Sequence, residues 1–254
     1  MTERLDILKI DAEWSPAPDD LDLPVGEIHT WIARLDEDDD DKGLDDKAAS
    51  GLSEEETRRA ARFKFDRDRD CYIRAHTVLR RLLGRYLGLV PSEVRIVQSS
   101  TGKPALAGDP ALSFNMSHTK TFALFGFSRL GPIGVDVEHV RSSVDVLSLA
   151  QRFFTTAESD LIANSGAEDQ LRYFFTAWVR KEAVVKAVGR GLAIPLSAVD
   201  VSPGDPAPHR TARLEEDPPS DWQVIDLPAP HEHLAALATD VRPSRVRCLR
   251  APSR

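Results

Sequence analysis

Two carboxylates in the segment "GPIGVDVEHV", residues 131–140, are spaced for metal chemistry. The segment has the β-branched content of a strand, and side chains alternate across a strand, so Gly134, Asp136 and Glu138 share one face. Adjacent like charges repel unless a cation lies between them, and carboxylate oxygens suit Mg²⁺, with Mn²⁺ as an alternative. The glycine beside them would leave room for a ligand. An amphipathic strand with a solvated acidic face is the other interpretation, and for Asp-x-Glu alone it is the favoured one.

A helix predicted over residues 168–188 carries a second set of charges. At 100° per residue its apolar side chains form one stripe, and Glu182 and Lys186 fall on a narrow face beside it. As a surface salt bridge, this i, i+4 pair would contribute only about 0.3–0.5 kcal/mol. Lys181 falls within the apolar stripe, where a long stem that reaches the edge of the stripe would account for it. Gly189 is expected to end the helix.

Two loops add polar groups of the kinds that an anion site needs. "TGKPAL" places Lys103 on a short turn, and "FNMSHTK" places Ser117 and His118 just past the end of a strand. Lysine supplies a positive charge, serine a hydroxyl donor, and histidine a donor that becomes cationic when a phosphate raises its pKa. Taken singly, a surface lysine, a capping serine and a structural histidine are the ordinary interpretations.

The elements that must position these residues come in blocks of strands and helices, which indicates an α+β fold. Ser53 and Glu56 have the spacing of a capping box that begins a helix, and Gly88 is a stop for the next helix. The first expected helix begins at Ser53, and three more cover residues 68–87, 144–163 and 168–188. The expected strands cover residues 27–36, 93–99, 111–117, 121–128, 132–140, 198–203 and 221–228. Residues 233–240 form either a buried strand or a short helix.

These elements divide into two α+β halves of similar size. Residues 1–132 would form the first half and residues 133–254 the second. A chain of 254 residues with 41% hydrophobic content can build a core for one large domain or two modest ones.

Charge and composition exclude some classes of partner. At a net charge of −8, the chain lacks the positive charge that wide contact with nucleic acid or an anionic membrane requires. Much of the acidity lies in residues 35–46, which are expected to form a solvated loop. No stretch is long and apolar enough to span a membrane, so we expect a cytoplasmic protein. Cys71 and Cys248 lie far apart and outside metal-ligand spacing, which predicts two reduced thiols.

Five segments, in order, resemble the Sfp-type 4′-phosphopantetheinyl transferases: "TGKP", "FNMSHT", "GVDVE", "FFTTAE" and "WVRKEAVVKAVGRGL", within residues 101–192. Hallmarks of that family are a Gly-Lys-Pro turn, an Asn-x-Ser-His segment, Gly-x-Asp-x-Glu and Trp-x-x-Lys-Glu-Ala-x-x-Lys. The flanking elements fit the family's layout over nearly the whole chain. The resemblance implies two similar α+β halves related by pseudo-two-fold symmetry, in a monomer whose active site lies in the cleft between the halves.

The reaction that the resemblance implies is transfer of the phosphopantetheine arm of coenzyme A to a serine of an apo acyl or peptidyl carrier protein, with release of adenosine 3′,5′-bisphosphate. Members of this family often serve polyketide or nonribosomal peptide synthases. By the same resemblance, Asp136, Glu138 and Glu182 would bind Mg²⁺, and Lys186 would contact the pyrophosphate. The expected catalytic residues are therefore Asp136, Glu182 and Lys186. Glu182 is the candidate general base, with a metal-bound water as the alternative.

The resemblance also implies which residues hold the nucleotide end of coenzyme A, including its 3′-phosphate: Lys103, Ser117 and His118. The family often has an arginine at the place that Cys71 takes here. Arg69 or Arg74 would then supply the missing cation, and we count Arg74 among the expected coenzyme A contacts.

Three smaller features have less weight. Val179 stands where the family has Ser or Thr, at a side chain that need not touch the ligand. Glu158 would either help shape the site or cap a helix with Thr155 or Thr156. The histidines of "HEH", residues 231–233, are interpreted as surface residues because an i, i+2 pair without further ligands makes a poor metal site.

Two other classes of function remain open. A metal-dependent phosphohydrolase or nuclease also uses clustered carboxylates, but it would not need Lys103, Ser117 and His118, and a nuclease would want a basic face. A non-catalytic coenzyme A-binding homologue would fit if Cys71 marks the loss of a phosphate contact. The presence of all three carboxylates and Lys186 counts against that homologue.

Overall fold

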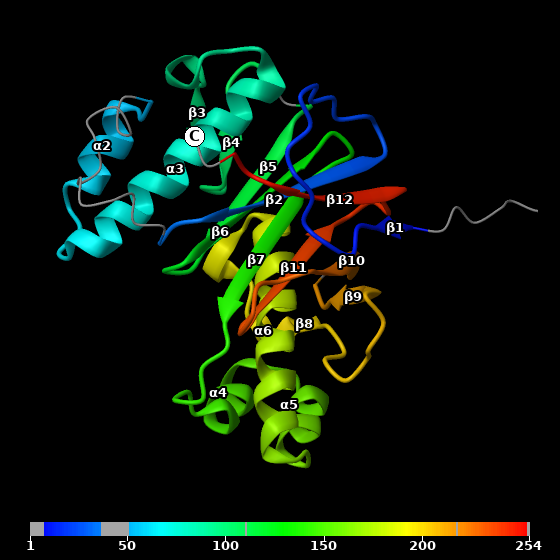
Figure 1. The fold of residues 1–254 in the computed structure, drawn as a ribbon. Helices are drawn as coiled ribbons and strands as arrows, with labels where there is room; N and C mark the ends of the chain where they lie inside the picture. The colour runs from blue at the N-terminus through cyan, green and yellow to red at the C-terminus, as the bar shows by residue number, and fades with distance from the viewer. Residues whose placement is uncertain (1–7, 37–50, 110, 217, 253–254) are drawn as a thin grey trace, which may run out of the picture.

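Two five-stranded sheets pack face to face, and each carries one long helix on its outer face (Figure 1). The computed structural model describes residues 8–36, 51–109, 111–216 and 218–252. This architecture confirms the predicted α+β fold of two similar halves. Residues 37–46 of the acidic run lie outside the described residues.

The first sheet is built from segments that are far apart in the chain. Its strands, in spatial order, are β1 (Lys9–Ile10), β12 (Arg245–Arg250), β2 (Glu27–Arg34), β6 (Phe122–Ser128) and β5 (Ser113–His118). β12 runs parallel to β1 and β2, whereas β2, β6 and β5 are antiparallel neighbours. The predicted division between residues 132 and 133 assigns β12 to the second half, but the strand lies in the sheet of the first.

The second sheet is antiparallel throughout. Its strands, in spatial order, are β7 (Ile133–His139), β11 (His233–Thr239), β10 (Ser220–Leu227), β9 (His209–Leu214) and β8 (Val199–Asp200). A separate two-stranded ribbon pairs β3 (Ile96–Gln98) with β4 (Pro104–Leu106). The ambiguous segment 233–240 is therefore a strand, and the strand expected over 198–203 shortens to β8. The sequence did not predict β1, β4, β9 or β12.

The helices follow the predicted order with one correction. They are α2 (Glu54–Ala60), α3 (Asp66–Leu87), α4 (Val146–Phe153), α5 (Thr156–Ala163) and α6 (Ala167–Val188), with 3₁₀ turns η1 (Pro91–Glu93), η2 (Gly191–Ala193) and η3 (Leu196–Ala198). The helix expected over 144–163 is two helices, because Phe154 adopts an extended conformation and Thr155 caps a new helix. Thr155 and Glu158 form a capping box, so the cap is Thr155 and not Thr156.

Both long helices have 22 residues and end in the same way. Gly88 follows α3 with φ 67°, and Gly189 follows α6 with φ 79°. This left-handed conformation suits glycine, which has no Cβ to clash with the preceding turn. The predicted stops are therefore confirmed, as is the capping box of Ser53 and Glu56 at the start of α2.

Three apolar layers hold the halves together. One lies between α3 and the first sheet, one between the two sheets, and one between the second sheet and α6. In the middle layer, Leu124 of β6 packs with Ile133, Val135 and Val137 of β7. This confirms the predicted alternation along β7, because the opposite face of the strand is left to face α6.

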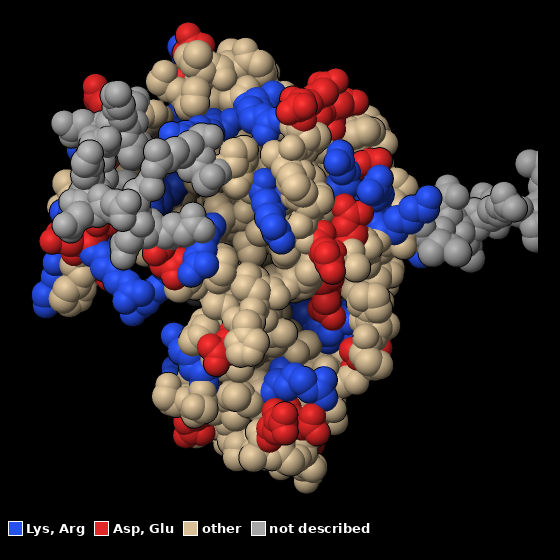
Figure 2. Space-filling model, viewed as in Figure 1, with Lys and Arg blue, Asp and Glu red and all other residues tan. Residues whose placement is uncertain are grey.

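Two observations bear on membrane and nucleic-acid binding. No helix in this part of the chain is both long and apolar enough to cross a membrane. On the face shown in Figure 2, Lys and Arg side chains are interspersed with Asp and Glu. A broad basic area, which nucleic-acid binding would favour, is not present on that face.

Candidate active site

Gly134 brings β7 into direct contact with α6. A Cβ atom at this position would overlap the carbonyl oxygen of Ala183 and the amide nitrogen of Ala187, both in α6. The prediction of free space for a ligand beside Gly134 is therefore wrong, because the helix backbone fills that space. The close approach also brings Asp136, two residues further along the same face of β7, up to Lys186 of α6.

Asp136 is the centre of a buried polar cluster drawn from both halves. Its Oδ1 atom lies 2.6 Å from Lys186 Nζ and accepts a hydrogen bond of 2.8 Å from Ser117 Oγ. Lys186 Nζ also donates to Ser117 Oγ at 2.9 Å, which closes a triangle of three side chains. The side chain of Asp136 is only 4% exposed, and its Oδ2 atom is buried without a hydrogen-bond partner among the described residues. A buried carboxylate oxygen of this kind calls for a further positive or donor group.

Asn115 fixes the position of Ser117 relative to β7. The amide N–H of Val135 donates to Asn115 Oδ1 at 2.9 Å, and this bond ties β5 of the first sheet to β7 of the second. Residues 115 and 117 point to the same face of β5 because side chains alternate along a strand. The sequence placed Asn115 inside the Asn-x-Ser-His segment but gave it no role.

Glu138 and Glu182 share the electrostatic field of Asp136. Burial raises the pKa of Glu138 to about 7, and the charges of Asp136 and Glu182 act in the same direction. Burial also raises the pKa of Glu182, again with Asp136 adding to the effect and Lys186 opposing it. The three predicted metal ligands are thus brought into one field. Among the described residues, however, no three His, Cys, Asp or Glu side chains are arranged closely enough to hold a metal ion.

Lys103 bridges the first half to the two elements that carry the carboxylates. Its Nζ donates to the carbonyl oxygens of Ile133 at the start of β7, at 2.8 Å, and of Ala187 at the end of α6, at 3.0 Å. Burial lowers the pKa of Lys103 to about 8. Its aliphatic stem packs so closely on Gly189 that a Cβ there would come within 2.9 Å of Lys103 Cδ. The predicted phosphate ligand therefore also ties the turn of residues 101–104 to the end of α6.

His118 lies at the end of β5, near the cluster but outside its hydrogen bonds. Its ring is exposed, and Nδ1 lies 3.2 Å from the carbonyl oxygen of Thr119. Partial desolvation lowers the pKa of His118, and the positive charges of His76 and Lys186 act in the same direction while the Thr119 contact opposes them. The ring is thus close enough to interact electrostatically with Lys186, and it is accessible to an incoming ligand.

The α3 residues considered as coenzyme A contacts bond within the first half. Arg74 Nη1 donates to the carbonyl oxygen of Leu35 at 3.0 Å, and Arg69 pairs with Asp66 at 2.8 Å. Cys71 is buried in the core of the first half, where burial raises the pKa of its thiol. These contacts lie within the first half, and the role of Arg74 toward coenzyme A stays a prediction.

A cleft of about 690 Å³ opens beside the cluster. Glu182, Lys186, Lys103 and Asn115 form part of its polar lining. Other residues on its wall are ones that the sequence did not predict as site residues, namely Arg152, Phe153, Trp178, Ile194, Pro195 and Leu196. The cleft thus offers cations and a carboxylate together with an apolar wall, as a ligand with both phosphates and an organic arm would require.

Two residues interpreted as peripheral are buried. Lys181 is fully buried and lies 2.6 Å from Glu158, so the interpretation of a stem that reaches solvent is wrong. His233 is also buried, and its Nε2 lies 3.1 Å from Thr121 Oγ1, whereas His231 is exposed. Sequence position alone could not reveal which neighbouring elements cover these side chains.

Comparison with known proteins agrees with this arrangement. A family described as "4'-phosphopantetheinyl transferase superfamily" matches residues 132–238, and a family described as "4'-phosphopantetheinyl transferase, N-terminal" matches residues 45–127. The 4'-phosphopantetheinyl transferase HetI of Nostoc sp. is 36% identical over 230 residues, which cover 89% of this chain and 92% of HetI. The 4'-phosphopantetheinyl transferase Sfp of Bacillus subtilis is 31% identical over 60% of this chain and 66% of Sfp.

A mammalian relative is also similar. The L-aminoadipate-semialdehyde dehydrogenase-phosphopantetheinyl transferase of Mus musculus is 27% identical over 75% of this chain and 68% of that protein. The chain therefore belongs to the 4′-phosphopantetheinyl transferase superfamily and is a transferase of the Sfp type. The resemblance read from the five sequence segments is confirmed.

Proposed function

We propose that this chain moves the 4′-phosphopantetheine arm of coenzyme A to a serine hydroxyl of an apo acyl or peptidyl carrier protein. The serine oxygen forms a bond to the phosphorus that bears the pantetheine arm. The bond from that phosphorus to the bridging oxygen breaks, and adenosine 3′,5′-bisphosphate leaves with that oxygen. The observation that carries the proposal is the convergence of Asp136, Lys186 and Ser117 beside a cleft that Lys186 lines.

We propose Mg²⁺ as the metal, with Mn²⁺ able to use the same oxygen donors. Asp136, Glu138 and Glu182 would hold it once their side chains close around the ion, since as described they are not arranged closely enough to do so. The support is the unpartnered Oδ2 of Asp136 together with the carboxyls of Glu138 and Glu182, whose pKa values are raised by burial and by the charge of Asp136. A bound cation would stabilise the ionised carboxylates of such a site. The described side chains place no cation at Asp136 Oδ2. When bound, the metal would neutralise charge on the pyrophosphate.

Positive groups for the phosphates would come from both halves. Lys186 would contact the pyrophosphate, because breaking its phosphoanhydride bond builds negative charge on the leaving oxygen. Lys103, Ser117 and His118 would serve the nucleotide end, and Lys103 already lines the cleft. Arg152, also on the cleft wall, is a further cation within this space. Arg74 remains a prediction from the family resemblance.

Glu182 would accept the proton of the carrier serine. It is half-buried, lines the cleft, and lies one helical turn from Lys186 on α6. A base at this position can reach a hydroxyl that enters the cleft from solvent while Lys186 faces the phosphates.

The test is the intact mass of apo carrier domains after incubation with the protein, coenzyme A and Mg²⁺. One carrier from a peptide synthase and one from a fatty acid synthase are compared, with EDTA as the control. We expect a metal-dependent gain of one phosphopantetheine, and loss of that gain in Asp136→Ala. Asp221→Asn is the matched control, since Asp221 is exposed and, within the described part of the chain, pairs with Arg213 at 3.0 Å.

The same assay separates the other classes. A non-catalytic homologue would bind coenzyme A without modifying any carrier, and a phosphohydrolase would cleave coenzyme A without any carrier present. Service to a polyketide or peptide synthase would appear as faster modification of that carrier. The cytoplasmic location and the monomeric state stay predictions from the sequence.

A further inference from the structure

Helix α6 carries three successive charged residues, Arg180, Lys181 and Glu182, and only the last lines the cleft. The side chain of Arg180 is 3% exposed and that of Lys181 is 0% exposed. A buried charge stabilises a fold weakly at best compared with well-packed apolar side chains. The contacts of each cation therefore decide which part of the fold it holds in place.

The ammonium group of Lys181 uses all three of its donors inside the second half. It pairs with Glu158 Oε2 at 2.6 Å, donates to the carbonyl oxygen of Leu196 at 3.0 Å, and donates to that of Val199. Glu158 in turn accepts from the amide N–H of Val201 at 2.9 Å. Lys181 and Glu158 thus hold the segment from η3 to the end of β8 against α6.

That segment continues directly into the wall of the cleft. Ile194, Pro195, Leu196 and Ser197 line the cleft together with Glu182. Leu196 therefore takes part twice: it lines the cleft, and its carbonyl oxygen is bound to Lys181. An apolar residue at 181 could fill the same volume, but it would leave the Leu196 and Val199 carbonyls without this donor.

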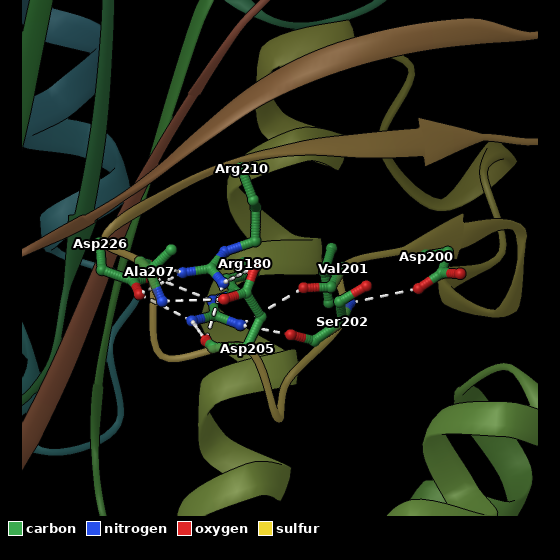
Figure 3. A network of polar contacts seen from close by, with 8 residues as sticks. All are labelled: Arg180, Asp200, Val201, Ser202, Asp205, Ala207, Arg210 and Asp226. Carbon is green, nitrogen blue, oxygen red and sulfur yellow. Dashed lines mark hydrogen bonds and ion pairs between the residues drawn. The ribbon is translucent and has the colours of Figure 1, made fainter. Parts of the chain in front are cut away.

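Arg180 makes an equally dense set of contacts away from the cleft (Figure 3). Its guanidinium forms a two-pronged contact with Asp226, at 2.9 and 2.7 Å, and donates to the carbonyl oxygens of Val201 and Ser202. Arg210 of β9 also reaches Asp226, at 2.8 Å. None of these residues is among those that line the cleft.

We propose that Lys181 is a positioning residue of the transfer reaction, which holds the Ile194–Ser197 wall in place to receive the organic arm of coenzyme A. The inference rests on the proposed transfer and adds a specific role for a residue that touches neither substrate nor metal. Arg180 is the neighbouring cation of α6 and is also buried. It differs from Lys181 because its partners lie outside the cleft. A comparison of variants at Arg180 and Lys181 therefore separates an effect on the cleft wall from an effect on stability.

The experiment compares Lys181→Met/Glu158→Gln, which removes both members of the buried pair, with Arg180→Met. Both variants are expected to melt at lower temperature. At a temperature where all are folded, only the Lys181 variant should raise the KM and the Kd for coenzyme A, by about tenfold, because only its wall is loosened. Hydrogen exchange at the amides of Ala198 and Val201 should also speed up in that variant before coenzyme A is added.

Two further variants keep the outcome decisive if the double variant fails to fold. Glu158→Gln alone keeps the lysine bonds to the carbonyl oxygens and is expected to keep KM within about twofold. Leu196→Ala, at a partly exposed position, is expected to raise KM because it thins the wall itself. Unchanged KM and Kd in Leu196→Ala, or equal changes in the Arg180 and Lys181 variants, would overturn the proposal. Coenzyme A affinity and hydrogen exchange can be measured without turnover. An inactive wild type would therefore reject the proposed transfer, while these two measurements would still decide whether Lys181 holds the wall in place.

Discussion

Ser117 Oγ donates a hydrogen bond to Asp136 Oδ1 over 2.8 Å, and this contact joins β5 of the first sheet to β7 of the second. Both side chains are buried, and Lys186 Nζ bonds to each of them. The proposed catalytic carboxylate is thus oriented by a residue from the other half. A movement of one sheet relative to the other would therefore change the hydrogen bond to Asp136.

Ser117→Ala tests this connection. The variant removes the donor to Asp136 and the acceptor for Lys186, so we expect about 1–3 kcal/mol less stability toward urea and about tenfold lower kcat/KM. Ser148→Ala is the control, because Ser148 is exposed and bonds with Asp145 at the start of α4. It should change stability by less than about 1 kcal/mol and leave turnover intact. Equal activity in the two variants would contradict an orienting role for Ser117.

Gly134→Ala tests the contact between β7 and α6. Its methyl group would overlap backbone atoms of α6, which cannot move as a flexible side chain can, so we expect a loss of at least about 3 kcal/mol and no turnover. Gly166→Ala is the matched control, since nothing lies within 4 Å of its Cβ position and its φ is −68°. It should cost less than about 1 kcal/mol. Thermal unfolding of both variants measures the difference, and a stable Gly134→Ala would show that the helix can shift.

Lys186→Met tests the cation at the site. The change keeps the length of the side chain but removes the charge next to Asp136, so kcat should fall by about 10²–10³. Lys64→Met, at an exposed position in the first half, serves as the control and should retain wild-type turnover. Carrier modification followed by mass spectrometry measures both. A Lys186 variant with near-normal kcat and only a raised KM would move the residue from catalysis to binding.

His29 predicts the pH dependence of stability. Burial lowers its pKa from 6.5 to about 4, with Arg247 acting in the same direction. As pH falls from about 6.5 to about 4, the unfolded chain takes up a proton that the native chain does not. Stability should therefore be lost across this window, by up to about 3 kcal/mol from this residue.

Urea unfolding at pH 7 and pH 4.5 measures the loss. In His29→Gln the contribution of this residue should disappear, so the two pH values should differ less than in the wild type. His231→Gln, at an exposed position, should keep the wild-type difference. An unchanged pH dependence in His29→Gln would assign the acid sensitivity to other groups.

Local patterns in the sequence were enough to find the site but not to assemble it. The alternation along residues 133–138 correctly put Asp136 on the face opposite Val135, and Gly189 correctly ended α6. These features depend on neighbours within a few residues. The identity of the atoms that cover Gly134 depends instead on packing between distant segments, so the expected ligand space beside it was wrong.

The same limit explains the errors on Lys181 and β12. A helical projection shows that Lys181 lies in an apolar stripe. It does not show that Glu158 and two backbone carbonyl oxygens bind the lysine there. In "RVRCLR" three of the six residues are arginine, so β12 resembles an exposed segment. Its partners, β1 and β2, are more than 200 residues earlier in the chain.

The position of β12 also bears on how the protein is made. Because β12 lies between β1 and β2, the first sheet has a gap at its interior until residues 245–250 have left the ribosome. By then every strand of the second sheet has already been synthesised. The first half therefore cannot mature during translation while the second is still being made, as successive domains do. Completion of the first sheet is instead a late event, and in a chain cut between residues 132 and 133 the second piece would have to supply this strand to the first.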